Sequence, residues 1–143
     1  MASIFVLNGV NLGSLGERRP EIYGEQTLDH IEQLLRDLFP NVQLEFRQTD
    51  YEGEFVAWIH EAADSDGLVL NPGAWTHYSY AIHDALEPVS ALKVEVHLSN
   101  VHSREEWRRE SVISPAVDAV VAGMGVYGYR AAVGYVLGAA ARD

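Results

Sequence analysis

Short apolar segments alternate with longer segments of helical periodicity along almost the whole chain. Five segments have the length and apolar content of buried strands: Ser3–Leu7, Val42–Arg47, Gly67–Leu70, Leu92–Leu98 and Ala119–Ala122. Apolar residues recur three or four positions apart in four other segments, which predicts helices over Thr27–Phe39, Glu54–Ala63, Ser79–Leu86 and Tyr127–Ala141. Strands that alternate with helices form a parallel sheet, because each helix returns the chain across one face of the sheet.

The length and composition limit what this sheet can belong to. At 143 residues, without a repeat or linker, the chain is expected to form a single domain over residues 1–143. We predict the flavodoxin-like α/β fold, a doubly wound five-stranded parallel sheet with helices on both faces. The net charge of −11 argues against general nucleic-acid binding. The absence of cysteine excludes disulfides, thiolate nucleophiles and Cys-ligated zinc, and it fits a cytoplasmic location.

Neither terminal segment has the character of a targeting or membrane segment. Met1 to Ser3 lead directly into the apolar Ile4–Leu7, without the basic region or long apolar region of a signal peptide. The apolar tail Ala131–Ala141 is too short to span a bilayer. We therefore expect no association with a membrane.

Polar side chains and glycines follow three of the predicted strands. The first strand leads into Asn8–Asn11, the third into Asn71–His77, and the fourth ends within Glu95–Asn100. Ligands of open parallel sheets bind beyond the carboxyl ends of the strands, so we expect these amides, imidazoles and hydroxyl to form a site. The alternative is that the asparagines and glycines only shape turns.

The segment between Leu7 and Thr27 shows no regular periodicity. It is much longer than the roughly 2–6 residues usual for a connection in such a fold, and long loops of this kind often close over binding sites. Within it, Glu17–Gly24 contains two arginines and Tyr23. A phenol is a poor base at neutral pH, but a neighbouring guanidinium favours the phenolate. The alternative is a solvated, charged loop in which Tyr23 is a hydrophobic anchor.

Four motifs occur in order along the chain. They are Asn8-Gly9-x-Asn11-Leu12-Gly13-x-Leu15-Gly16-x-Arg18-x-Pro20-x-x-Tyr23-Gly24, Asn71-Pro72-Gly73-Ala74-x-Thr76-His77-x-Ser79, Glu95-Val96-His97-Leu98-Ser99-Asn100 and Ser103–Arg108. Together they resemble the type II 3-dehydroquinate dehydratases, and the likeness extends from near residue 4 to about residue 137.

The resemblance implies a hydro-lyase of the shikimate or quinate route. It would dehydrate 3-dehydroquinate to 3-dehydroshikimate by anti elimination through an enolate, with no metal and no organic cofactor. We expect a cytoplasmic protein. The family commonly forms dodecamers built from trimers, so a homo-oligomer is expected here.

The resemblance also implies a role for each matching residue. Tyr23 would be the base that removes the proton alpha to the ketone, with Arg18 lowering its pKa, and His97 would be the general acid. Asn11 would hold a water molecule that hydrogen-bonds the enolate oxygen. The substrate carboxylate would be bound by Asn71 and the backbone amides of Leu98 and Ser99. The ring hydroxyls would be bound by His77, by Arg108 and by Asp84 of a neighbouring subunit.

Parts of the sequence also suggest three other functions: dinucleotide binding, a signalling receiver and a non-catalytic relative of the family. Gly123-x-Gly125-x-x-Gly128 matches a dinucleotide fingerprint, but it lies in the last unit, so these glycines are expected to pack the final helix onto the sheet. A signalling receiver would need acidic residues where Asn8 and Asn71 lie. A non-catalytic relative would retain the fold without the chemistry, although both Tyr23 and His97 are present.

The remaining titratable residues receive structural interpretations. The only lysine, Lys93, lies within a predicted strand, which argues against imine chemistry. No histidine pair has the His-x-x-x-His spacing of a helical metal site. Glu95 is expected to point to the strand face opposite His97 and is given no role. Ser103 is expected to cap a short helix, in a capping box with Glu106.

Overall fold

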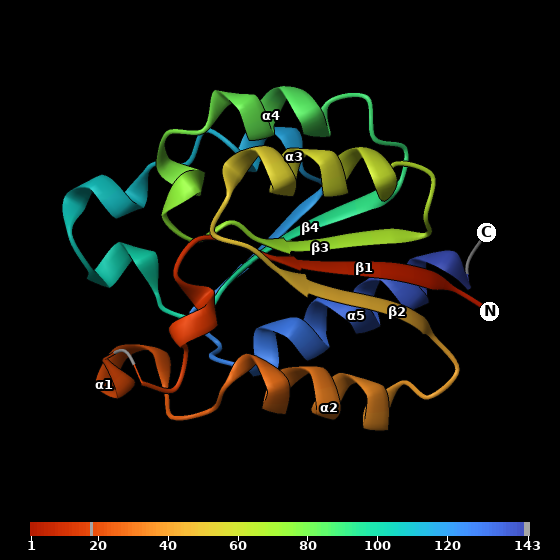
Figure 1. Cartoon of the computed structure of the whole chain (residues 1–143), viewed down its shortest axis with the longest axis horizontal. Helices are drawn as coiled ribbons and strands as arrows, with labels where there is room; N and C mark the ends of the chain where they lie inside the picture. Colours follow the sequence, from red (N-terminus) through yellow and green to blue (C-terminus); the bar gives the residue numbers. More distant parts are fainter. Residues whose placement is uncertain (18, 142–143) are drawn as a thin grey trace.

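Five strands form one sheet in which every neighbouring pair is parallel. The computed structural model describes residues 1–17 and 19–141 (Figure 1). The strands are β1 (Ser3–Asn8), β2 (Gln43–Gln48), β3 (Gly67–Asn71), β4 (Leu92–His97) and β5 (Ala119–Ala122). Their order, β2-β1-β3-β4-β5, is the flavodoxin-like doubly wound order and confirms the predicted fold class.

Two longer helices cover each face of the sheet. α3 (Glu52–Glu61) and α4 (Tyr80–Leu86) lie on one face, and α2 (Leu28–Leu38) and α5 (Tyr127–Ala140) lie on the other (Figure 1). Each pair packs on its own apolar layer. No helix among residues 1–17 and 19–141 is long and apolar enough to cross a membrane.

The inner strand β1, which lies between β2 and β3, contributes side chains to both layers. Ile4 and Val6 pack in the layer under α2 and α5, whereas Phe5 and Leu7 pack in the layer under α3 and α4. This alternation follows from the two-residue period of a strand, and burial on both faces explains why the whole segment is apolar. Because both faces of the strand are covered by apolar side chains, polar groups that bind a ligand are expected at the strand ends.

Side-chain caps define where two of the helices begin. The Thr27 hydroxyl accepts a hydrogen bond from the His30 backbone N–H, and the His30 ring accepts one from the Thr27 N–H. Ser79 caps α4 in the same way through the Ile82 N–H. Both caps stand where the sequence predicts a helix start.

The capping box predicted at Ser103 is wrong. Ser103 is the last residue of a short turn of 3-10 helix, η3 (Val101–Ser103), and Glu105 precedes the next one, η4 (Glu106–Arg109). The side chain of Asn100 caps η3 by accepting from the His102 N–H. Asn100 thus caps the turn that precedes Arg104, and η4 begins at Glu106 without a side-chain cap.

The long first loop contains two short helical turns that periodicity did not reveal. They are η1 (Leu12–Ser14) and α1 (Pro20–Tyr23). The buried side chains of Leu12 and Leu15 hold the first part of the loop against the domain. Each turn is too short to show a hydrophobic period, so the sequence pattern could not separate it from irregular loop.

The glycines after β5 only partly pack α5 onto the sheet. A Cβ on Gly128 would lie 3.2 Å from Val96 Cγ1 and 3.4 Å from Val121 Cγ1, so this glycine allows close approach of helix and sheet. Gly125 has a φ of +57° and nothing within 4 Å of a Cβ position. Its role is to permit the left-handed turn rather than to pack the helix.

Candidate active site

Three predicted site strands end side by side. Asn8, Asn71 and His97 are the last residues of β1, β3 and β4, and Asn8 is paired in register with Asn71. All three strands are parallel and adjacent, so their last side chains meet at one edge of the sheet. The edge predicted from the sequence is therefore the place where the polar residues gather.

Most of the predicted site residues line one pocket at this edge. Those lining it are Asn11, Tyr23, Asn71, His77, His97, Leu98, Ser99 and Arg108. They come from the first loop, from the ends of β3 and β4, from η2 (Gly73–His77) and from η4. Residues up to about 100 positions apart in sequence thus contribute to one cavity.

Two of the predicted site residues are not in this pocket. Arg18 lies outside the described residues. Asp84 lies on α4 with an exposed side chain and does not line the pocket of its own chain. It has His83 and Glu87 near it, but both His83 ring nitrogens already bond to the Val112 carbonyl and to Glu87.

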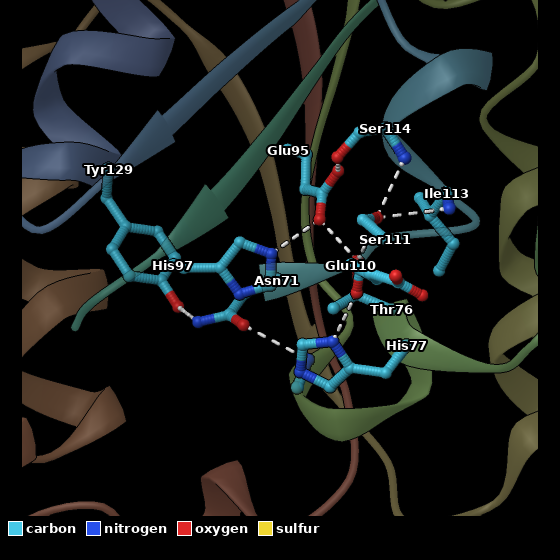
Figure 2. Close-up of polar contacts among 11 residues, drawn as sticks. Asn71, Thr76, His77, Glu95, His97, Glu110, Ser111, Ile113, Ser114 and Tyr129 are labelled. Carbon is cyan, nitrogen blue, oxygen red and sulfur yellow. Dashed lines mark hydrogen bonds and ion pairs between the residues drawn. The ribbon is translucent and has the colours of Figure 1, made fainter. Parts of the chain in front are cut away.

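His97 is held by a buried carboxylate. Its Nε2 lies 2.5 Å from Oε2 of Glu95, which is fully buried (Figure 2). The expectation that these side chains point to opposite faces is wrong, because residues two positions apart in a strand share a face. A carboxylate only accepts hydrogen bonds, so Nε2 carries the proton and Nδ1 is left for a ligand.

Three hydroxyl groups complete the surroundings of Glu95. Thr76 donates to Oε2, and Ser114 donates to Oε1 at 2.7 Å. Ser111 lies 2.8 Å from the Thr76 hydroxyl and donates to it, because the Thr76 proton is directed to Glu95 (Figure 2). Burial alone would raise the pKa of Glu95, but the hydrogen bond and charge of His97, with the two hydroxyls, hold this pKa below its usual value of 4.5.

The surroundings of His77 favour a neutral imidazole with its proton on Nδ1. Its Nδ1 lies 2.6 Å from the Glu110 carbonyl oxygen, so Nδ1 is the donor and Nε2 is an acceptor (Figure 2). Burial lowers the pKa of His77, and the nearby charges of His97 and Arg108 lower it further against the opposing bond to Glu110. The two histidines therefore differ: one is paired with a carboxylate and the other is not.

A second aromatic side chain lies beside this histidine. The Trp107 ring stands edge-to-face with His77, with ring centroids 5.1 Å apart. The Arg108 guanidinium lies 4.1 Å from the Trp107 ring centroid, and its Nε bonds Glu105 at 2.5 Å. These contacts orient Arg108 at the pocket wall.

Arg104 also lines the pocket, although the sequence motifs predict no role for it. Its guanidinium lies 5.0 Å from the Tyr23 ring centroid, and its Nη1 donates to the Ser99 hydroxyl at 3.2 Å. Its Nε is buried without a hydrogen-bond partner. The signal in the sequence was its place in the Ser103–Arg108 motif, but nothing in the spacing placed it against Tyr23.

Asn11 begins the first helical turn in a left-handed conformation, with a φ of +67°. Its backbone N–H donates to Asp50 at 2.8 Å, and its carbonyl accepts from the Ser14 hydroxyl at 3.0 Å. Asparagine adopts this region more readily than most residues. The backbone of Asn11 is thus fixed on both sides while the residue lines the pocket.

The chain is similar in sequence to proteins of one known family. The sequence model described as Dehydroquinase class II matches residues 2–137. The chain belongs to this family. A relative from Kineococcus radiotolerans named 3-dehydroquinate dehydratase is 53% identical over 138 residues, 94% of each chain. One from Botryotinia fuckeliana named catabolic 3-dehydroquinase is 51% identical, over 94% of this chain and 92% of its own.

Solved structures agree with the family assignment. The type II dehydroquinase from Propionibacterium acnes has a TM-score of 0.92 and 45% identity to this chain, and it matches over 95% of this chain and 96% of its own. The resemblance and the hydro-lyase class predicted from the sequence are therefore confirmed. In this class II dehydroquinase fold, the pocket at the strand ends is the candidate active site.

Proposed function

We propose that this chain dehydrates 3-dehydroquinate to 3-dehydroshikimate by anti elimination through an enolate. The observation that supports this most is one pocket that collects a phenol, an imidazole bound to a buried carboxylate, and several amide donors. The names of the relatives supply the substrate. We treat residues 1–143 as one catalytic domain, because the pocket lies at the edge of the single described sheet.

The proposed base is Tyr23. As a phenolate it takes the proton from the carbon alpha to the ketone, and the electron pair of the broken C–H bond forms the enolate. The guanidinium of Arg104 lies 5.0 Å from the Tyr23 ring centroid, so its positive charge is close to the proposed base. The same role predicted for Arg18 stays a prediction. A water molecule held by Asn11 would stabilise the enolate oxygen by a hydrogen bond.

The proposed general acid is His97. When the enolate collapses to the enone, the C–O bond breaks and the proton on His97 Nδ1 passes to the departing hydroxyl, which leaves as water. Glu95 is the positioning residue for this step: its carboxylate accepts from Nε2–H and so orients the ring with Nδ1 as the nitrogen that donates to the substrate. General acid–base steps of this kind typically contribute roughly 10²–10⁴-fold each.

The remaining pocket residues are proposed to bind the substrate. Asn71 and the backbone N–H groups of Leu98 and Ser99 would bind the carboxylate. His77, through the acceptor Nε2, and Arg108, through its guanidinium, would bind ring hydroxyls. Held at both ends, the ring is positioned between base and acid, and this orientation lowers the entropic part of the barrier.

We also propose that the protein acts in the cytoplasm as a homo-oligomer, a dodecamer built from trimers. The exposed position of Asp84 on α4, away from its own pocket, is compatible with its predicted contribution to a neighbouring subunit. Light scattering should then give a mass of twelve chains. A monomer that is fully active would contradict the role of Asp84.

The direct test is to add 3-dehydroquinate to the purified chain and follow the absorbance of the conjugated enone product in the ultraviolet. We expect a steady rise that depends on enzyme concentration. The proton removed and the hydroxyl lost should be anti, as read from substrate with deuterium at one of the two alpha positions. No rise at high enzyme concentration would contradict the proposed activity.

A further inference from the structure

Asn71 can bind a carboxylate only if its amide N–H, rather than its carbonyl oxygen, faces the ligand. The question depends on the proposed function, which assigns Asn71 to the substrate carboxylate. Nothing in the sequence around Asn71 decides which end of the side chain faces the pocket. In the structure, this is decided by a chain of hydrogen bonds that starts at the Arg47 backbone, outside the pocket, and ends at Asn71.

This chain begins at a backbone carbonyl. Asn8 Nδ2 donates to the Arg47 carbonyl oxygen at 3.0 Å, which leaves Asn8 Oδ1 as an acceptor. The Tyr129 hydroxyl, which reaches the sheet from α5, donates to that oxygen at 2.7 Å. With its proton used, the Tyr129 oxygen can only accept, and Asn71 Nδ2 donates to it at 2.9 Å (Figure 2).

The other end of Asn71 is fixed by a backbone donor. The Gly73 N–H donates to Asn71 Oδ1 at 3.2 Å, so the carbonyl oxygen is turned away from Tyr129. Both ends of the hydrogen-bond chain therefore require the same orientation of the amide. One N–H of Asn71 goes to Tyr129, and the second stays available in the pocket that Asn71 lines.

The Tyr129 hydroxyl is suited to this role because it stays protonated. Asn8, Asn71 and Tyr129 are all buried. Burial raises the pKa of Tyr129 above its usual value, and the hydrogen bond from Asn71 opposes this only in part. The Tyr129 hydroxyl is therefore protonated at neutral pH, which fixes the direction of these hydrogen bonds there.

We propose that Tyr129 is a positioning residue for substrate binding, which acts through Asn71 by holding its amide with an N–H directed at the substrate carboxylate. Tyr129 does not touch the substrate. Its loss should weaken carboxylate binding and leave the proton transfers of Tyr23 and His97 largely unchanged.

The test is a double-mutant cycle with Tyr129→Phe and Asn71→Ala. Kinetics with 3-dehydroquinate give kcat and KM, and calorimetry with the product 3-dehydroshikimate gives Kd, even for a variant that is inactive. With Asn71 present, we expect Tyr129→Phe to raise KM and Kd about tenfold, as for the loss of a hydrogen bond to a charged group, with kcat within about threefold. In the Asn71→Ala background, the same change should alter Kd less than about twofold.

Val133→Ala is the matched control. Val133 is buried on α5 in the same apolar layer as Tyr129 but carries no polar atom. This variant should lower Tm and leave KM and Kd unchanged. If Tyr129→Phe only lowers Tm in the same way, or raises Kd equally with and without Asn71, the proposal is wrong.

Asn8→Ala provides a second route if Tyr129→Phe does not fold. This change removes the acceptor of the Tyr129 proton, so the hydroxyl can donate elsewhere and the Asn71 amide can rotate to accept that proton through Oδ1. Kd for 3-dehydroshikimate should then rise, and an unchanged Kd would overturn the proposal. Failure of the proposed function is seen separately, as wild-type protein that neither converts 3-dehydroquinate nor binds the product.

Discussion

The imidazole Nε2 of His97 and the carboxylate Oε2 of Glu95 lie 2.5 Å apart at the end of β4, with Glu95 enclosed by the protein. This pair connects the buried sheet to the open pocket. The carboxylate defines which nitrogen of His97 is bound and which one can transfer a proton. It also places a buried negative charge beside that ring.

Glu95→Gln should therefore impair the general acid. The amide keeps the shape of the side chain but removes the negative charge beside His97, and it can present an N–H instead of an acceptor to Nε2. We expect kcat to fall roughly 10²-fold, with a much smaller change in KM. Glu61→Gln, an exposed change on α3 that affects only an ion pair with Arg47 outside the pocket, should leave kcat unchanged. Equal kcat values for Glu95→Gln and wild type would contradict the role of Glu95.

The same residue predicts how stability depends on pH. The pKa of Glu95 in the folded state lies below its usual value of 4.5. Its ionised form therefore adds to the free energy of unfolding at pH values above 4.5, and this contribution is lost as the pH falls through the lower folded pKa. Denaturant unfolding of wild type and Glu95→Gln from pH 3 to 7 should show a difference that shrinks toward acid pH, and a constant difference would contradict it.

Tyr23→Phe removes the proposed base and leaves the ring in place. We expect kcat to fall by about 10²–10⁴-fold while KM changes only a few-fold, because the hydroxyl acts in the proton transfer. Tyr51→Phe is the matched control, since Tyr51 is 76% exposed and does not line the pocket. A kcat within tenfold of wild type would exclude Tyr23 as the base.

Arg104 should affect turnover through its charge over the Tyr23 ring. Arg104→Met removes the charge and keeps much of the side-chain volume, and we expect kcat to fall by about tenfold or more. Arg104→Lys keeps the charge but not the planar stacking, so its kcat should be intermediate. Arg36→Lys, on the exposed face of α2, should have no effect. Unchanged kcat in Arg104→Met would show that the charge is not used.

Borohydride should not inactivate the enzyme. Imine chemistry needs a lysine in the pocket, but the only lysine is Lys93, whose Nζ donates to the Val89 carbonyl at 2.8 Å near the amino end of β4. Protein treated with 3-dehydroquinate and borohydride, then desalted, should retain its activity and its mass. Lost activity with a substrate adduct on Lys93 would overturn the enolate route.

How much of the site could be predicted depends on how each residue is placed. Asn8, Asn71 and His97 follow predicted strands, and the geometry of a parallel sheet puts them at one edge without further information. The position of Glu95 could also be predicted, because a strand places residues two apart on one face. The prediction of opposite faces for Glu95 and His97 is an error in applying this rule. Arg104 was not within reach, since its contact with Tyr23 depends on how two loops pack.

By itself, the sequence determined the five strands, the long helices and the edge of the sheet where polar groups gather, because these follow from local periodicity and from strand direction. Only the tertiary structure decided which of these polar side chains contact each other. Tyr129 meets Asn71 across 58 residues and Asn8 across 121. Such contacts depend on the packing of α5 against the sheet, and local patterns carry no information about distances across so long a stretch of chain.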